Sequence, residues 1–172
     1  MKYFFDTEFI EDGKTIDLLS IGIVAEDGRE LYLENNDADL TKASPWVREH
    51  VFPGMVWQRR VQRSHECIRE DVYAFVLGGN RHPWGHTVPW PEDVPRPEFW
   101  AYYADYDWVV LCQLFGWMID LPPGFPKYCR DFKQLIDQFP DFELDKGGQN
   151  HNALDDARWL KREYDRLQAK LR

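Results

Sequence analysis

Two acidic residues near the N-terminus interrupt a strongly apolar segment and are candidates for metal chemistry. Asp6 and Glu8 lie two positions apart in residues 3–10, where aromatic and β-branched residues surround them. In a β-strand alternate side chains share a face, so these carboxylates lie on one side, roughly 7 Å apart along the backbone. Burying two like charges is costly unless a cation neutralises them. The segment therefore predicts a divalent metal site, while an exposed strand end explains the pair equally well.

A third acid, Asp107, lies within a helix predicted at residues 106–117. Its side chain falls on the apolar stripe of that helix, which consists of Leu111, Leu114, Phe115 and Met118. Asp105 precedes the predicted helix and suits a capping role. Asp107 is therefore expected to face the core although it carries a charge.

A fourth acid, Asp156, lies near the start of a long C-terminal helix. Asn152 is predicted to cap this helix, with Asp155 as its capping-box partner. At about 100° per residue, Asp156 falls roughly 65° from the centre of the apolar stripe, whereas Asp155 falls on nearly the opposite face. Asp156 is thus expected to point toward the sheet. His151 stands just before the helix, and its functional interpretation depends on the acids near it.

Carboxylates gathered from separate elements could bind a pair of divalent ions. Two ions roughly 3.5–4 Å apart can bind a phosphodiester, orient a water and stabilise the leaving oxygen. An all-oxygen ligand set favours Mg²⁺ or Mn²⁺ over zinc. A neutral imidazole beside them, here His151, could accept the proton of the attacking water. The pattern therefore predicts a hydrolase.

The composition indicates a folded, acidic protein. The chain has 172 residues, 44% of them hydrophobic, and a formal net charge of −9, so a polyanion would have to be held locally by metals and a few basic residues. Three widely spaced cysteines without a Cys-x-x-Cys pair argue against a disulfide framework or a structural zinc site. Neither a signal pattern nor an apolar run of membrane-span length is evident. The length suits one domain, residues 1–172. Since no targeting or membrane signal is evident, we expect the protein in the cytoplasm.

Hydrophobic periodicity and turn signals predict an alternation of strands and helices. Strands are expected at residues 3–10, 17–25, 30–34, 99–104 and 127–129. Helices are expected at residues 45–51, 66–77, 106–117 and 130–139, and after Asn152. Hairpin turns join the first three strands, which are therefore antiparallel. The predicted architecture is an α/β layer sandwich on a mixed sheet of five strands.

Two segments have no assigned role in this scheme. Residues 58–63 hold the only basic cluster of the first half, for which a solvated face is a commoner explanation than contact with a phosphate backbone. Residues 80–98 form a loop insertion rich in Pro, Gly and Trp, of a kind that often serves as a lid or binding loop. In this loop, Trp84 or Trp90 either stacks on a base or packs onto the domain.

Three motifs carry a family resemblance. They are Asp6-Thr7-Glu8, Tyr106-Asp107 at a helix start, and His151 followed five positions later by Asp156. Together they resemble the DEDDh group of DnaQ-like 3′-5′ exonucleases, in the ribonuclease H-like superfamily. Residues 5–13 and 106–114 are more specifically similar to the small mycobacterial-type 3′-5′ exoribonucleases. The wider group often has Asn-Ala-x-Phe-Asp where this chain has Tyr103-Ala104-Asp105-Tyr106-Asp107, and the helical-face argument favours Asp107 there.

This resemblance implies a ribonuclease H-like three-layer fold, with helices on both faces of the mixed sheet. It implies that two Mg²⁺ or Mn²⁺ ions are bound by Asp6, Glu8, Asp107 and Asp156. It further implies that His151 is the general base and that Phe9 and Thr7 contact the terminal nucleotide. Similar enzymes remove nucleotides from the 3′ hydroxyl end of single strands, release 5′-monophosphates and are frequently homodimers. The expected partner is therefore the 3′ end of single-stranded RNA, and no membrane partner is expected.

Two alternative functions use the same motifs. A DNA exonuclease of the proofreading type would carry the same acids, because the metals act on phosphates common to RNA and DNA, and the 2′-hydroxyl must be sensed by other contacts. A catalytically silent nucleic-acid-binding or protein-interaction module could keep the fold without the reaction. The presence of all five catalytic candidates argues against the silent module.

Overall fold

A mixed six-stranded sheet forms the centre of the computed structural model, which describes residues 1–79, 83, 85, 88–147 and 150–172. The sheet has the order β4-β3-β2-β1-β5-β6. Its strands are β1 (Lys2–Glu11), β2 (Ile16–Ala25), β3 (Glu30–Asn35), β4 (Gln62–Arg63), β5 (Glu98–Ala101) and β6 (Arg130–Asp131). The α-helices are α1 (Pro45–His50), α2 (His65–Val76), α3 (Asp105–Gln113), α4 (Phe132–Ile136) and α5 (Ala153–Lys170). Short 3₁₀ turns are η1 (Leu40–Lys42), η2 (Phe52–Gly54) and η3 (Met118–Asp120).

Strand β1 is an interior strand, as the sequence predicts. It pairs antiparallel with β2 on one edge and parallel with β5 on the other. In the β1–β2 ladder Asp6 lies opposite Gly22 and Glu8 lies opposite Ser20, and the register shifts just after Glu8. The acidic pair therefore sits in the middle of the sheet, immediately before an irregularity that redirects the end of the strand.

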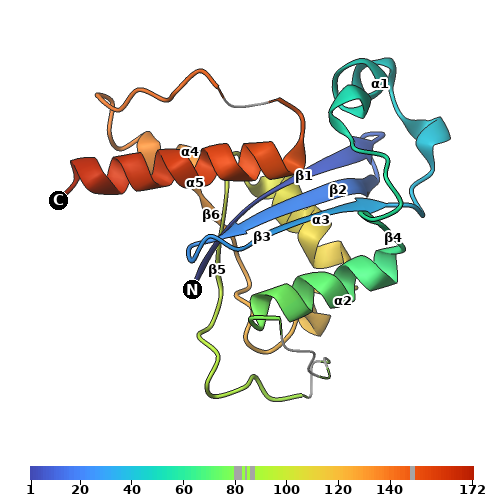
Figure 1. Cartoon of the computed structure of the whole chain (residues 1–172), viewed down its shortest axis with the longest axis horizontal. Helices are drawn as coiled ribbons and strands as arrows, with labels where there is room; N and C mark the ends of the chain where they lie inside the picture. The colour runs from blue at the N-terminus through green and yellow to red at the C-terminus, as the bar shows by residue number, and fades with distance from the viewer. Residues whose placement is uncertain (80–82, 84, 86–87, 148–149) are drawn as a thin grey trace.

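Both faces of the sheet are covered by helices, which gives three layers (Figure 1). Tyr3 and Phe5 of β1 point to the face where α2 and α3 pack. Phe4, on the alternate side, packs against α4 and α5. A smaller cluster places Ile10 and Leu19 against α1. Because the acids share the side of Phe4, they lie on the face that α5 covers.

The sheet has six strands rather than the predicted five. The additional strand, β4, lies inside the basic cluster and pairs parallel with β3. The strand predicted at residues 127–129 was wrong in position, because β6 pairs with β5 at Arg130 and Asp131. Two-residue strands such as these have no periodic signal of their own and are defined by the neighbour they pair with.

Two helices are shorter than predicted. Helix α3 ends at Gln113, four residues early, and Met118 of its expected stripe is 60% exposed in η3. Asp105 is the first residue of α3 rather than its cap, and Ala104 occupies the cap position. Helix α4 spans only five residues, capped by Asp131, whose side chain accepts a hydrogen bond from the amide of Lys133.

The described part of the loop at residues 80–98 packs onto the domain. The indole of Trp90 lies 6.0 Å from the ring of Phe125 and 6.3 Å from that of Tyr73, and its N–H donates to the carbonyl of Val94. Trp90 is therefore a packing residue. Trp84, the other tryptophan considered for stacking on a base, lies outside the described residues.

No helix in the described parts of the chain combines the length and the apolar character that crossing a bilayer requires.

Candidate active site

Three carboxylates from two elements meet on the α5 face of the sheet. Asp6 and Glu8 come from β1 and Asp156 from the first turn of α5, and each offers an oxygen within 4.8 Å of the others. Glu8 is 7% exposed, while Asp6 and Asp156 are partly exposed. The alternative of an exposed strand end is therefore wrong for this pair.

A glycine opposite Asp6 lets α5 approach the sheet. A Cβ atom at Gly22 would lie 2.3 Å from the backbone of Ala153 and Leu154, so only glycine fits between β2 and the start of the helix. Because Gly22 faces Asp6 across the ladder, this close approach brings Asp156 to the acidic pair. Sequence analysis did not single out Gly22, since its importance depends on a contact with a helix far along the chain.

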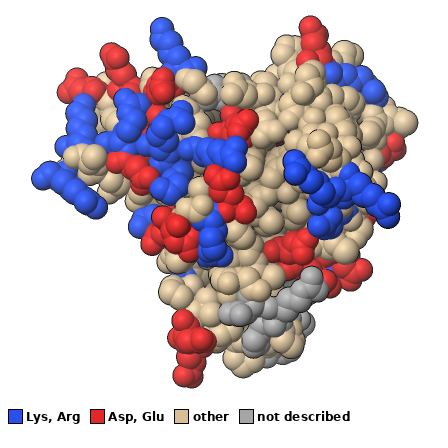
Figure 2. Space-filling model, in the orientation of Figure 1, with Lys and Arg blue, Asp and Glu red and all other residues tan. Residues whose placement is uncertain are grey.

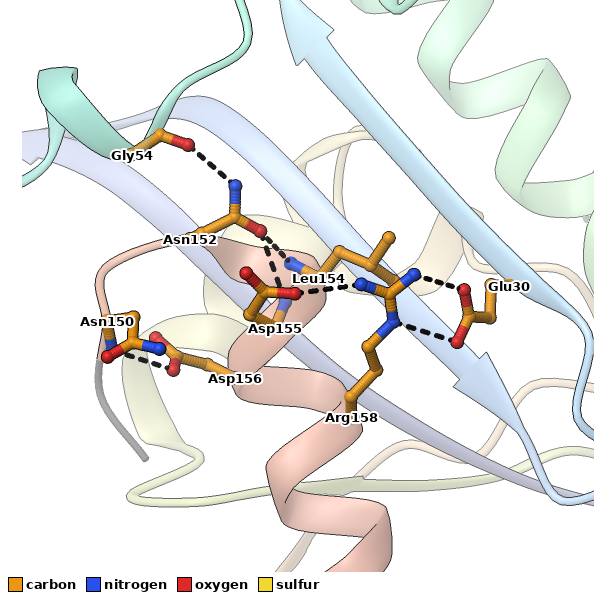
Figure 3. Close-up of polar contacts among 8 residues, drawn as sticks. All are labelled: Glu30, Gly54, Asn150, Asn152, Leu154, Asp155, Asp156 and Arg158. Atoms are coloured by element: carbon orange, nitrogen blue, oxygen red, sulfur yellow. Dashed lines mark hydrogen bonds and ion pairs between the residues drawn. The ribbon is translucent and has the colours of Figure 1, made fainter. Parts of the chain in front are cut away.

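The start of α5 is fixed by its cap (Figure 3). The side-chain oxygen of Asn152 accepts hydrogen bonds from the amides of Leu154 and Asp155, at 3.2 and 3.1 Å. Its Nδ2 donates to the carbonyl of Gly54 in η2 at 2.6 Å. The predicted cap is therefore confirmed, and it also ties α5 to η2.

Asp155 and Asp156 point in different directions, as their positions on the helix predict (Figure 3). Asp156 accepts a hydrogen bond from the amide of Asn150 at 3.0 Å. Asp155 pairs with Arg158 at 2.8 Å, and Arg158 also binds Glu30 of β3. The capping-box role predicted for Asp155 was wrong, because its carboxylate turns toward Arg158.

Asp107 is a buried acid at the start of α3, held by Thr7. It is 6% exposed, and its Oδ1 accepts from the Thr7 amide at 2.9 Å and from the Thr7 hydroxyl at 2.6 Å. Asp107 therefore faces the core as predicted. It comes from α3, which packs on the face of the sheet opposite α5. Thr7 was predicted to contact substrate, and the structure shows that its hydroxyl is bonded to Asp107.

The electrostatics of these acids reflect burial and mutual repulsion. Burial, and then the charges of Asp107, Glu8 and Asp156, raise the pKa of Asp6 well above its ordinary value. Burial and the same kind of repulsion, from Asp156 and Asp107, raise the pKa of Glu8 to about 8. Burial raises the pKa of Asp107 to about 6, against the lowering effect of the hydrogen bonds from Thr7.

The donor set fits a divalent cation. Its ligand atoms are carboxylate oxygens, the type that Mg²⁺ and Mn²⁺ prefer. Burial and mutual repulsion raise the pKa values of Asp6 and Glu8, and a bound cation would offset both effects. Asp6, Glu8 and Asp156 are the residues that could hold it, with Asp107 beside them.

His151 lies at the same cavity and is held by an aromatic contact. The ring of Trp46 in α1 meets it edge-on, with centroids 5.0 Å apart, and Trp46 itself stacks on His50 at 4.8 Å. His151 has a φ of 53°, and its carbonyl would lie 2.5 Å from a Cβ at Gly54. This left-handed backbone, in close contact with η2, places the imidazole on the wall of the cavity that the acids also line.

An open cavity of about 550 Å³ connects these groups. Phe9 and Tyr106 form a stacked pair on its wall, with centroids 5.8 Å apart and planes 11° from parallel. Sequence analysis assigned no place in the site to four further aromatic residues that line the cavity, although two of them belong to the second motif: Trp46, Tyr102, Tyr103 and Tyr106. Isolated aromatic residues in loops and short helices carry no signal of function until the fold gathers them.

The fold and the site together define an α/β protein whose clustered carboxylates, next to an aromatic cavity, suit divalent-metal hydrolysis. The model of the Rv2179c-like 3′-5′ exoribonuclease domain matches residues 1–167, and the chain belongs to that family. Two relatives are the 3′-5′ exoribonuclease Rv2179c of Mycobacterium tuberculosis H37Rv and the 3′-5′ exoribonuclease MT2234.1 of M. tuberculosis CDC 1551. Each is 40% identical over 164 residues, which cover 92% of this chain and 88% of the relative. The chain is therefore an enzyme of an exoribonuclease family.

Proposed function

We propose that the protein is a metal-dependent 3′-5′ exoribonuclease of the DEDDh type, with a ribonuclease H-like fold in a single domain. It hydrolyses single-stranded RNA from the 3′ hydroxyl end and releases nucleoside 5′-monophosphates in the cytoplasm. The observation that carries this proposal is the convergence of the Asp6, Glu8 and Asp156 carboxylates within 4.8 Å. Family membership supplies the direction and the RNA substrate of the proposed reaction.

The proposed cation ligands are Asp6, Glu8, Asp107 and Asp156. Two Mg²⁺ or Mn²⁺ ions bound there would orient the attacking water and stabilise the leaving oxygen. Thr7 keeps the Asp107 carboxylate turned into the site through its hydroxyl and amide. Gly22 and the Asn152 cap keep Asp156 against β1.

His151 is the proposed general base, because its imidazole lines the same cavity as the acids. It would accept the proton of the attacking water. Trp46 restricts the ring through its edge contact, so Trp46 is a proposed positioning residue. The stacked rings of Phe9 and Tyr106 supply a flat apolar wall for the terminal base and sugar.

The proposed assembly is a homodimer. Large apolar side chains are exposed on and around η3, at 79% for Trp117, 60% for Met118, 72% for Ile119 and 60% for Tyr128. Lys127 donates to the carbonyl of Met118, so Tyr128 lies close to η3. We call these four residues the η3 patch. A second copy of the chain is the proposed occupant of the η3 patch, which has the apolar character of a homodimer interface.

The test is a time course on a 5′-labelled single-stranded RNA with a free 3′ hydroxyl, with Mg²⁺ or Mn²⁺ and with chelator. DNA of equal sequence and the same RNA with a 3′ phosphate are run beside it. The proposal predicts a metal-dependent ladder that shortens from the 3′ end of the unblocked RNA. Equal or faster shortening of DNA would instead support the proofreading-type exonuclease. Absence of shortening with both metals would support the silent binding module.

A further inference from the structure

The basic cluster at residues 58–63 contains two arginines that no acid neutralises among the described residues. Arg59 and Arg60 are both exposed and take part in none of the ion pairs of the described chain. The third arginine of the cluster, Arg63, pairs with Asp71 of α2 at 3.3 Å. Arg59 and Arg60 are therefore free to bind an anion.

Basic side chains of α5, in contrast, are paired with acids. Arg158 binds Glu30 and Asp155, and Lys161 binds Asp165. Its basic side chains thus alternate with acids, which is typical of a solvated helix face. Figure 2 shows the contrast, with mixed blue and red atoms over α5 and a separate blue group over the segment between α1 and β4.

The backbone just before Arg59 and Arg60 is fixed by hydrogen bonds to a buried carboxylate. Glu34 of β3 is 1% exposed, and its carboxylate accepts hydrogen bonds from the amides of Val56 and Trp57. The turn is closed by the Val61 amide, which donates to the carbonyl of Gln58 at 2.9 Å. A buried carboxylate therefore fixes the shape of an exposed turn.

Trp57 adds an aromatic surface beside the arginines. Its φ of 55° lies in the left-handed region, which a bulky side chain rarely adopts. The indole N–H donates to the carbonyl of Phe52, and the side chain is still 41% exposed. An exposed tryptophan two residues before a pair of unpaired arginines offers two contacts that single-stranded nucleic acid uses, stacking on a base and binding of phosphates.

This turn is close to the cavity wall. Trp46 lines the cavity, and Gly54 packs against the backbone of His151. Arg59 follows Gly54 by five residues, so the two Cα atoms are at most about 18 Å apart. A strand whose 3′ end lies in the cavity can therefore pass over η2 to the arginines.

We propose that Arg59, Arg60 and Trp57 bind the RNA strand on the 5′ side of the terminal nucleotide, the arginines on phosphates and the indole on a base. This proposal rests on the exoribonuclease function proposed above. It accounts for RNA binding by a chain with a net charge of −9, because the local positive charge lies where the strand leaves the cavity.

The test compares substrates of two lengths in the Arg59→Ala/Arg60→Ala protein. For RNA of about 16 nucleotides, the upper end of common single-strand site sizes, we expect KM to rise about tenfold. A dinucleotide has a single internucleotide phosphate, the one that is cleaved, so it offers the arginines no phosphate on the 5′ side, and its KM should stay within about twofold of the wild type. Trp57→Ala should raise KM on the long RNA alone, and Trp57→Phe should restore most of it. Arg96→Ala/Arg172→Ala removes two exposed arginines, one ahead of β5 and one after α5, and is the control for net charge.

Salt dependence gives a second measurement. In an Asp6→Asn background, which removes cleavage, loss of two phosphate contacts should make the slope of log affinity against log salt less negative by about 1.4. The inference would be overturned by an unchanged slope and KM in the Arg59→Ala/Arg60→Ala protein, by an equal KM rise on the dinucleotide, or by the same effect from Arg96→Ala/Arg172→Ala. The proposed exoribonuclease function is tested separately. It is wrong if the wild-type protein shortens neither the long RNA nor the dinucleotide.

Discussion

Glu8 is a buried carboxylate in the middle of β1, with acidic neighbours and no basic partner among the described ion pairs. Its raised pKa means that the folded chain favours the protonated form. A bound divalent cation reverses this preference, because it stabilises the charged carboxylates together. The stability of the protein should therefore depend on pH and on metal.

The sign of the pH effect follows from linkage. With the pKa of Glu8 at about 8 in the folded state, ionisation costs stability at high pH, and this cost is relieved as pH falls toward the ordinary glutamate range. In chelator, we expect the wild-type Tm to rise by about 4–8 °C as pH falls from about 8 to about 6, a change of roughly 2 kcal/mol. Glu8→Gln should weaken this dependence, and Mn²⁺ should raise the wild-type Tm at high pH. A wild-type Tm in chelator that falls over this range would contradict the account.

Thr7 is expected to act through Asp107. Thr7→Val removes the hydroxyl bond and keeps the amide bond, so the carboxylate should lose orientation. We expect activity to fall about 10-fold and the Mn²⁺ concentration for half-maximal activity to rise, as for other residues that orient metal ligands. Thr7→Ser keeps the hydroxyl and should retain most of the activity. If the valine and serine variants have equal metal dependence, Thr7 does not position Asp107.

At the scale of elements, the approach of α5 to β2 assembles the carboxylates. Gly22→Ala would place a Cβ 2.3 Å from the backbone of Ala153 and Leu154, so the helix must shift. We expect a loss of about 1–3 kcal/mol in the free energy of unfolding, measured by denaturant titration, together with lower activity. Gly147→Ala is the control, because the nearest atoms of described residues would lie 3.9 Å or more from its Cβ. A Gly22→Ala protein as stable and active as the wild type would show that α5 is not fixed there.

The elements that bear the acids could be predicted because they are long and regular. Alternation in β1 placed Asp6 and Glu8 on one face, and the helical period placed Asp156 toward the sheet. The cap at Asn152 followed from residue type alone and is confirmed. These arguments need only local periodicity, which the sequence contains.

The parts that could not be predicted depend on contacts between distant segments. Strand β4 exists because β3 offers it an edge, and Gly22 matters because α5 lies on it. Trp46 joins the site only because α1 brings it to His151. No local pattern marks such residues, since each is defined by a neighbour far along the chain.

At the scale of the whole molecule, the η3 patch is the surface expected to join two copies. Ile119→Asp places a charge in this patch and should convert the dimer to a monomer, measured by light scattering after size-exclusion chromatography. Leu171→Asp is the control, because it changes another exposed apolar side chain at the end of α5. Equal effects of both variants, or a wild-type protein that is already monomeric, would contradict this assignment.

The acids of the first turn of α5 offer the most direct test of the central claim. Asp156 meets Asp6 and Glu8, whereas its neighbour Asp155 pairs with Arg158 on another side of the helix. The measurement is the rate of RNA shortening with Mn²⁺ by Asp156→Asn and Asp155→Asn. The account predicts a loss of about 100-fold or more for Asp156→Asn and a change within about twofold for Asp155→Asn. Comparable rates for the two variants would show that the carboxylate cluster is not the catalytic centre.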